Sequence, residues 1–315
     1  MRRYKVLVSA PLMQLEIEKF RSFFQEQAIE IDLPQIVEKM KEEDLLQIIE
    51  NYDGVVAGDD EFTSQVLDRA KRLRVISKWG TGIDSIDREH AEKLGIRVYN
   101  TLNAFSEPVS DSVIGYILCF ARNIIESDRD IREGLWKKTK CYTLEEQTLG
   151  IIGLGNCGLA VARKASAFGM KILGNDIREI SPSVLEQHRV SSVDKDTIYG
   201  SCDYITLHPD LNPTSYYMIT ERELKKMKPS VVLINTSRGP VIKEADLVRA
   251  LEKGWIRGAA LDVFEAEPLP SDSKFRTLGN CILSPHNSNS SFKCWDRVHE
   301  NTLKNLLEGL KNERK

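Results

Sequence analysis

The chain has 315 residues, a formal net charge of −3 and 29% charged residues. This length predicts two domains, and the charge excludes the basic surface that nucleic acids or membrane surfaces require. The six cysteines are scattered without a Cys-x-x-Cys pair, and the N-terminal segment carries no secretory signal. We therefore expect a cytoplasmic protein with reduced thiols, no zinc site, and a small-molecule partner.

The first hundred residues alternate between strand-like and helix-like segments. Strands are expected at 5–9, 54–57, 75–78 and 98–100, and helices near 15–26, 64–70 and 87–95. This alternation predicts an α/β domain with a parallel sheet covered by helices.

A long helix expected at 109–122 leads into a second series of strand–helix units. Strands are expected at 149–153, 172–175, 190–192, 204–208, 231–235, 258–263 and 281–284. They predict a second doubly wound parallel sheet. The tail from Ser290 to Lys315 has helical spacing and is expected to pack on the first domain. We therefore predict a substrate domain of residues 1–100 completed by 288–315, and a cofactor domain of residues 101–287.

One glycine-rich turn lies between the first strand of the second series and a helix. It reads Gly153-Leu-Gly155-Asn156-Cys157-Gly158. The first glycine allows the tight turn, the second lets the backbone approach a pyrophosphate, and the third lets the helix pack on the strand. The phosphates are expected at the helix N-terminus, which begins near Cys157 and favours anions.

Asp176 follows the next strand at the distance expected of the acid that binds the adenosine ribose. Its carboxylate would repel a 2′-phosphate. The turn and the acid together predict NAD, in preference to NADP, as the cofactor.

Three polar side chains follow later strands, at the sheet edge where open α/β sheets bind ligands. They are Arg238, Glu267 and His286. Arginine can bind a planar carboxylate with two hydrogen bonds, and histidine exchanges protons near neutral pH. A neighbouring glutamate would orient the ring and favour the imidazolium. This set matches the needs of an enzyme that reduces a 2-keto acid.

At these positions the chain resembles the D-isomer-specific 2-hydroxyacid dehydrogenases, a family that includes phosphoglycerate dehydrogenase and glyoxylate/hydroxypyruvate reductase. The resemblance covers nearly the whole chain. It includes the segments 78–87, 100–101, 153–158, 207–208, 235–239, 260–268 and 284–286.

The resemblance implies two Rossmann-like or flavodoxin-like domains with the active site in the cleft between them, and a homodimer associated through the cofactor domains. It implies catalytic roles for Arg238, Glu267 and His286, with Glu267 rather than Glu265 as the match because it directly precedes Pro268. It also implies that a backbone turn receives the substrate carboxylate and that a further set of side chains lies along the cofactor. These residues are Gly80, Thr81 and Gly82 for the substrate, and Thr236, Ser237 and Asp262 for the cofactor.

The chain departs from the family pattern after the catalytic histidine, where Asn287–Ser291 replaces a glycine-bearing turn, and at Pro209, which stands one place early. No regulatory domain is expected after residue 315. His208 ends a strand near the expected cofactor, so contact with NAD and a structural role are both open. Cys157 could be a redox-sensitive thiol or, as we favour, a small apolar filler.

Two other functions share these features. An NAD-sensing binding protein, like the related co-repressors, could keep the site without physiological turnover. Formate dehydrogenase is a further relative, but its chemistry needs no proton donor, and Glu267 beside His286 argues against it. The identity of the 2-hydroxy acid stays open from the sequence.

Overall fold

The computed structural model describes residues 3–311. The chain divides into two compact units, one formed by the residues up to Ala104 with those from Ser291 onwards, the other by Phe105–Ser290. The sequence suggested boundaries after residues 100 and 287. No helix within residues 3–311 is long and apolar enough to cross a membrane.

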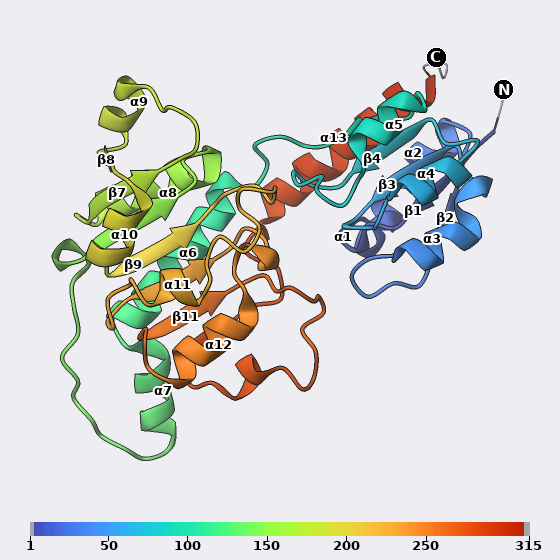
Figure 1. Ribbon diagram of the computed structural model, residues 1–315. Coiled ribbons are helices and arrows are strands. Elements are labelled where there is room, and N and C mark those ends of the chain that lie inside the picture. Colours follow the sequence, from blue (N-terminus) through green and yellow to red (C-terminus); the bar gives the residue numbers. More distant parts are fainter. Residues whose placement is uncertain (1–2, 312–315) are drawn as a thin grey trace. The chain divides into compact units, whose positions relative to one another are not determined.

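The first unit contains a five-stranded, all-parallel sheet with the order β2-β1-β3-β4-β5 (Figure 1). This is a flavodoxin-like order. The central strands β3 and β4 are fully buried because helices cover both faces. The strands are β1 Tyr4–Val8, β2 Ile29–Asp32, β3 Gly54–Ala57, β4 Val75–Lys78 and β5 Arg97–Tyr99.

The helices of the first unit differ from expectation at its start. One helix was expected near 15–26, but the chain forms three short ones, since Glu16 and Phe20 leave the helical region of backbone space. The edge strand β2 and helix α3 were not expected, because both are short and half polar. The helices are α1 Pro11–Leu15, η1 Ile17–Phe20, α2 Arg21–Glu26, α3 Glu42–Ile48, η2 Ile49–Asn51, α4 Ser64–Arg69, α5 Arg88–Lys93 and α13 Phe292–Lys311.

Helix α13, from the C-terminal end of the chain, packs against β3 and β4 of the first unit. Ser77 Oγ donates a buried hydrogen bond of 2.7 Å to the carbonyl of Thr302. A Cβ on Gly309 would lie 2.3 Å from Val75 Cγ2, so the helix approaches the sheet where it has no side chain. The tail expected to continue to Lys315 lies, from residue 312 on, outside the described residues.

The second unit contains a seven-stranded, all-parallel sheet with the order β12-β11-β10-β9-β6-β7-β8 (Figure 1). This is the Rossmann order, extended by one strand, and it reverses between β6 and β9. The strands are β6 Thr148–Ile152, β7 Lys171–Asn175, β8 Val190–Ser192, β9 Tyr204–Leu207, β10 Val232–Asn235, β11 Gly258–Leu261 and β12 Cys281–Leu283.

Helices cover both faces of this sheet, and each face has its own buried apolar cluster. Helix α6 begins at Ser106, earlier than expected, because Pro108 is tolerated in a first helical turn. Helix α7 was not expected and has no buried residue. The helices are α6 Ser106–Ala121, α7 Ile124–Arg132, η3 Leu144–Glu146, α8 Asn156–Ala167, α9 Pro182–Gln187, α10 Lys195–Ser201, α11 Glu221–Leu224, η4 Gly239–Val241, α12 Glu244–Glu252 and η5 Lys274–Thr277.

Replacing Gly309 with alanine should destabilise the first unit, because the new methyl group would collide with Val75. We expect a loss of about 1–3 kcal/mol in the free energy of unfolding, measured by urea denaturation. The control is Gly115→Ala in α6, where a Cβ meets no atom within 4 Å. That variant should be neutral or gain up to about 1 kcal/mol from helix propensity. Equal effects of the two changes would contradict the packing of α13.

Candidate active site

Two glycines of the turn after β6 are required by the packing of the protein itself. Gly153 has φ +96°, and a Cβ there would lie 2.6 Å from the carbonyl carbon of His208. A Cβ on Gly158 would lie 2.0 Å from the carbonyl oxygen of Gly153. These contacts join β6, the start of α8 and the residues after β9 without any intervening side chain.

Gly155 is different, because its surroundings are open. The nearest heavy atom to a Cβ built there is Arg178 Nη2, at 3.9 Å. Asn156 and Cys157 begin α8, a helix of 12 residues whose first N–H groups are directed to the same place. An open cradle at a helix N-terminus fits the pyrophosphate of a dinucleotide.

The thiol of Cys157 does not have the properties of a redox sensor. Burial raises the pKa of Cys157, and this outweighs a hydrogen bond with Ser106. A raised pKa keeps the group protonated and poorly nucleophilic at neutral pH. The side chain therefore acts as a small filler at the start of α8.

Asp176 directly follows β7 and is held by the glycine-rich turn. Its Oδ2 accepts the backbone N–H of Leu154 at 2.8 Å, and its Oδ1 accepts that of Arg178 at 2.9 Å. Burial raises the pKa of Asp176. The two backbone hydrogen bonds and the Arg178 guanidinium lower the pKa by more than burial raises it, so the net shift is downward. Asp176 is thus a carboxylate at neutral pH.

His208 follows β9 and bonds within its own strand. Its Nε2 lies 2.9 Å from Thr206 Oγ1. Burial lowers the pKa of His208 to about 4, so the ring is neutral at pH 7. The backbone at 208–209 also packs on Gly153. Pro209, one of the departures from the family pattern, therefore lies in a segment whose path the glycine turn constrains.

The segment after β10 is organised by Asn235. Its Oδ1 accepts the amide and hydroxyl of Ser237, at 3.1 and 2.8 Å, and its Nδ2 donates to the carbonyl of Arg238 at 2.9 Å. Thr236 Oγ1 is buried and makes no hydrogen bond to any part of the chain that the structure describes. An orphaned hydroxyl on the edge of a Rossmann sheet fits a polar group of the cofactor.

The residue after Arg238 is a glycine for steric reasons. A Cβ on Gly239 would lie 1.9 Å from the carbonyl carbon of Phe264. The chain after β10 therefore touches the chain after β11, and Arg238 lies beside the loop that carries Glu267. The Arg238 guanidinium donates to the carbonyl of Ser237 at 2.9 Å.

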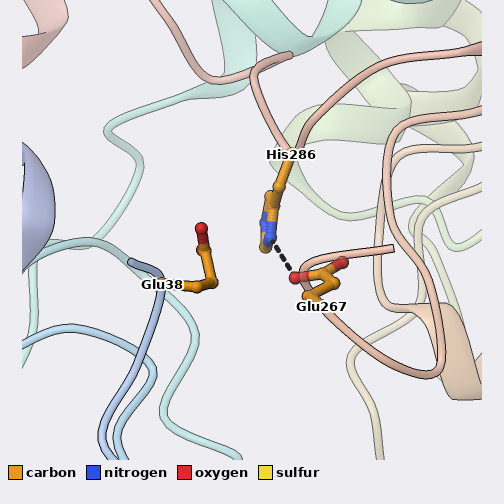
Figure 2. Close-up of side chains that lie close together, drawn as sticks. All are labelled: Glu38, Glu267 and His286. Carbon is orange, nitrogen blue, oxygen red and sulfur yellow. Dashed lines mark hydrogen bonds and ion pairs between the residues drawn. The ribbon is translucent and has the colours of Figure 1, made fainter. Parts of the chain in front are cut away.

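Glu267 and His286 form a direct pair within the second unit (Figure 2). Glu267 Oε2 lies 2.9 Å from His286 Nδ1, and its Oε1 accepts the backbone N–H of Phe264 at 2.8 Å. Both side chains are one-fifth exposed. The contact fixes the orientation of the imidazole ring.

Glu265 does not share this role. Its carboxylate accepts the backbone N–H of Glu244 at 2.9 Å, and its own N–H donates to Glu244 Oε1 at 2.6 Å. This reciprocal pair ties the loop to the start of α12. Of the two acids in the loop, Glu267 is the one bonded to His286.

The loop after His286 is held by Asp262, which is 1% exposed. Its two carboxylate oxygens accept the N–H groups of Asn287 and Ser288, each at 2.9 Å. The His286 N–H donates to the Asp262 carbonyl at 2.7 Å, and His286 has φ +50°. The carboxylate therefore supports the histidine through the backbone that follows it.

The first unit carries the turn Gly80-Thr81-Gly82 at the end of β4. Thr81 Oγ1 donates to the carbonyl of Thr101 at 2.8 Å, and Asn100 Nδ2 donates to the carbonyl of Thr81 at 2.6 Å. These bonds connect the turn to the segment after β5, so the turn is braced from a second strand end.

Two residues near these segments were not proposed as site residues from the sequence. Lys78 is 5% exposed and pairs with Asp59 at 3.1 Å, just before the Gly80 turn. Arg178 pairs with Asp176. The sequence offered a signal for Lys78, since a lysine inside an apolar strand is unusual. It offered no signal for Arg178, because a single arginine in a loop is common.

Comparison with known proteins identifies the family. The family profile described as "D-isomer specific 2-hydroxyacid dehydrogenase, NAD binding domain" matches residues 114–288. The chain belongs to this family. It is 38% identical over 287 residues to a glyoxylate reductase of Thermococcus litoralis, covering 88% of this chain and 84% of that protein.

Two further relatives bear on the assignment. A D-3-phosphoglycerate dehydrogenase of Methanocaldococcus jannaschii is 37% identical over 291 residues, which are 91% of this chain and 54% of that protein. The crystal structure of an Aquifex aeolicus D-lactate dehydrogenase with NAD and lactic acid is similar, with a TM-score of 0.86 and 25% sequence identity. The match covers 98% of this chain and 97% of that chain. The chain is an NAD-dependent dehydrogenase with a Rossmann-like α/β fold.

Gly155→Ala should leave folding intact and weaken NADH binding, because a methyl group there meets open space that the pyrophosphate would fill. We expect an unchanged melting temperature and a dissociation constant raised about tenfold or more, measured by NADH fluorescence. Gly158→Ala is the matched contrast, since its methyl group would strike the backbone of Gly153. It should lower the melting temperature. Normal NADH binding by folded Gly155→Ala protein would exclude this turn as the pyrophosphate site.

Proposed function

We propose that the protein reduces a small 2-keto acid to the D-2-hydroxy acid with NADH, using His286 as the proton donor. The observation that carries the proposal is the 2.9 Å contact between His286 Nδ1 and Glu267 Oε2 at the carboxyl edge of the second sheet. This arrangement is a general acid and the group that orients it. It also argues against formate oxidation, which needs no proton donor.

When bound, NADH supplies the hydride. His286 holds the proton that the substrate oxygen receives, and its Nε2 is the nitrogen that exchanges it, since Nδ1 engages Glu267. Glu267 favours the imidazolium before transfer and keeps the ring in one orientation. In the opposite direction the same nitrogen accepts the proton of the alcohol.

The substrate is oriented by charge and by backbone N–H groups. Arg238 binds the carboxylate and carbonyl oxygens of the 2-keto acid through its guanidinium. The turn Gly80-Thr81-Gly82 supplies further N–H donors for the carboxylate. The pyrophosphate is held by the glycine-rich turn, which consists of Gly153, Gly155, Asn156, Cys157 and Gly158. The adenosine ribose is held by Asp176. The rest of the cofactor site is formed by His208, Thr236, Ser237 and Asp262.

Glyoxylate, hydroxypyruvate and phosphohydroxypyruvate are the substrates we expect first. The relatives named as glyoxylate reductases and D-3-phosphoglycerate dehydrogenase support this set. All six cysteines are unbridged, which suits the reducing environment of the cytoplasm. The direct test is NADH oxidation with these three acids and pyruvate. Saturable NADH binding without turnover of any of them would favour the NAD-sensing alternative.

His286→Asn should reduce kcat by about 100-fold or more with little change in NADH affinity, because it removes the proton donor and leaves the cofactor site intact. Glu267→Gln should also lower kcat and should change its pH profile, since the partner that favours the imidazolium is neutralised. Stopped-flow and steady-state rates of NADH oxidation measure both.

The matched control is Glu265→Gln, on the same loop but bonded to Glu244 rather than to His286. It should leave kcat and its pH profile unchanged. Unchanged turnover in His286→Asn would remove this histidine from the mechanism, while equal losses in both glutamate variants would indicate a structural effect of the loop.

We also propose that two copies associate through the second unit, on α7 and the loop that follows it. This segment extends from the sheet (Figure 1) and exposes apolar side chains on an element without a buried residue. They are Ile124, Ile125, Ile131, Leu135, Trp136 and Tyr142, with Trp136 83% exposed. A patch of this kind on a helix marks an association surface, and a two-fold dimer covers it on both copies at once.

Ile131→Glu combined with Trp136→Ser should convert the dimer to a monomer, because it places a charge in the apolar surface and removes its largest ring. Sedimentation velocity measures the mass. Leu15→Ser, which removes a 75% exposed apolar side chain of the first unit, should leave the dimer intact. A parent protein that sediments as a monomer would contradict this association.

A further inference from the structure

Asp176, the residue expected to bind the adenosine ribose, is electrically compensated by its neighbour. Arg178 Nε lies 3.2 Å from Asp176 Oδ1, and Arg178 Nη2 lies 3.4 Å from Oδ2. The aspartate side chain is 6% exposed and the arginine side chain is 67% exposed. The pair therefore presents a guanidinium to solvent, with the carboxylate beneath it.

The guanidinium is also directed back toward the glycine-rich turn. Its Nη2 is the heavy atom nearest to the open position at Gly155. The arginine thus spans the two segments that a dinucleotide would contact, the pyrophosphate cradle before α8 and the acid after β7. Planar guanidinium groups bind phosphates with paired hydrogen bonds.

These contacts change the expectation drawn from Asp176 alone. An isolated carboxylate repels a 2′-phosphate. The ion pair of Asp176 and Arg178 has no net charge, so this repulsion is compensated. In dinucleotide sites an arginine near the ribose accommodates the 2′-phosphate of NADP. The side chain that would do so here stands two residues after the acid and already faces the site.

We propose that Arg178 determines cofactor specificity, by giving the 2′-phosphate of NADP(H) a cationic partner, so that the protein binds NADPH as well as NADH. The inference rests on the proposed placement of the adenosine ribose at Asp176. When the Arg178 guanidinium turns from Asp176 to the 2′-phosphate, it exchanges one ion pair for another. Asp176 keeps the two backbone N–H groups that hold it, so NADH binding does not depend on the arginine.

The opposing explanation is that Arg178 makes an ordinary surface ion pair, which contributes little to stability or binding. The two explanations differ in what the removal of the guanidinium does to the ratio of the NADPH and NADH dissociation constants. Only a specificity residue changes that ratio. A surface pair leaves it unaltered.

The experiment is fluorescence titration of the full chain with NADH and with NADPH, which needs no substrate and no turnover. In the parent protein we expect dissociation constants within about tenfold of each other. Arg178→Ala should raise the NADPH constant about tenfold or more and the NADH constant less than about threefold, with Arg178→Lys between the two because it keeps the charge and loses the paired geometry.

The matched control is Arg163→Ala, which removes another half-exposed arginine paired with a carboxylate, that of Glu107 at 2.6 Å. It should leave both constants unchanged. An unchanged ratio in Arg178→Ala, or a parent protein that binds NADH but rejects NADPH by about 1,000-fold, would overturn the inference while leaving the NADH-dependent function standing. Failure of the parent protein to bind NADH would instead overturn the cofactor site itself and this inference with it.

Discussion

The second unit depends on places where backbone segments touch without a side chain between them. Gly158 lies against the carbonyl of Gly153, Gly153 against the backbone at His208, and Gly239 against the backbone at Phe264. These contacts join the chain after β6 to the chain after β9, and the chain after β10 to the chain after β11. A methyl group at any of these three glycines would push the neighbouring turns apart. The polar side chains beside those turns would then move relative to one another.

Two acidic side chains hold His286 in position, one through the backbone and one through the ring. Asp262 is buried and fixes the backbone after the histidine through two N–H groups. Glu267 bonds to the imidazole itself. Because backbone and ring are held separately, the ring keeps its direction even though the loop from Asn287 to Ser291 lacks the family's glycine-bearing turn. The difference therefore changes the chain after Asn287 and leaves the support of the imidazole in place.

Charge at the proposed ribose-binding position is a property of the Asp176–Arg178 pair rather than of one residue. Asp176 predicts a preference for NAD when it is considered alone, and the Arg178 guanidinium compensates it in the folded chain. The same logic applies to Lys78 in the first unit, whose charge inside a strand end is balanced by Asp59. In both cases an ion pair within the chain compensates the charge of a side chain at a strand end.

The sequence by itself determined the two α/β layers, the glycine-rich turn and the order of Arg238, Glu267 and His286, because periodicity and motif spacing are local properties. It missed the short edge strand β2 and the exposed helix α7, whose apolar patterns are weak or have no buried face. The family resemblance already favoured Glu267 over Glu265, but only the tertiary structure gave the two acids their different partners and brought Arg178 near Gly155. These last facts depend on side chains meeting across the ends of different strands, and no spacing along one chain encodes such distances.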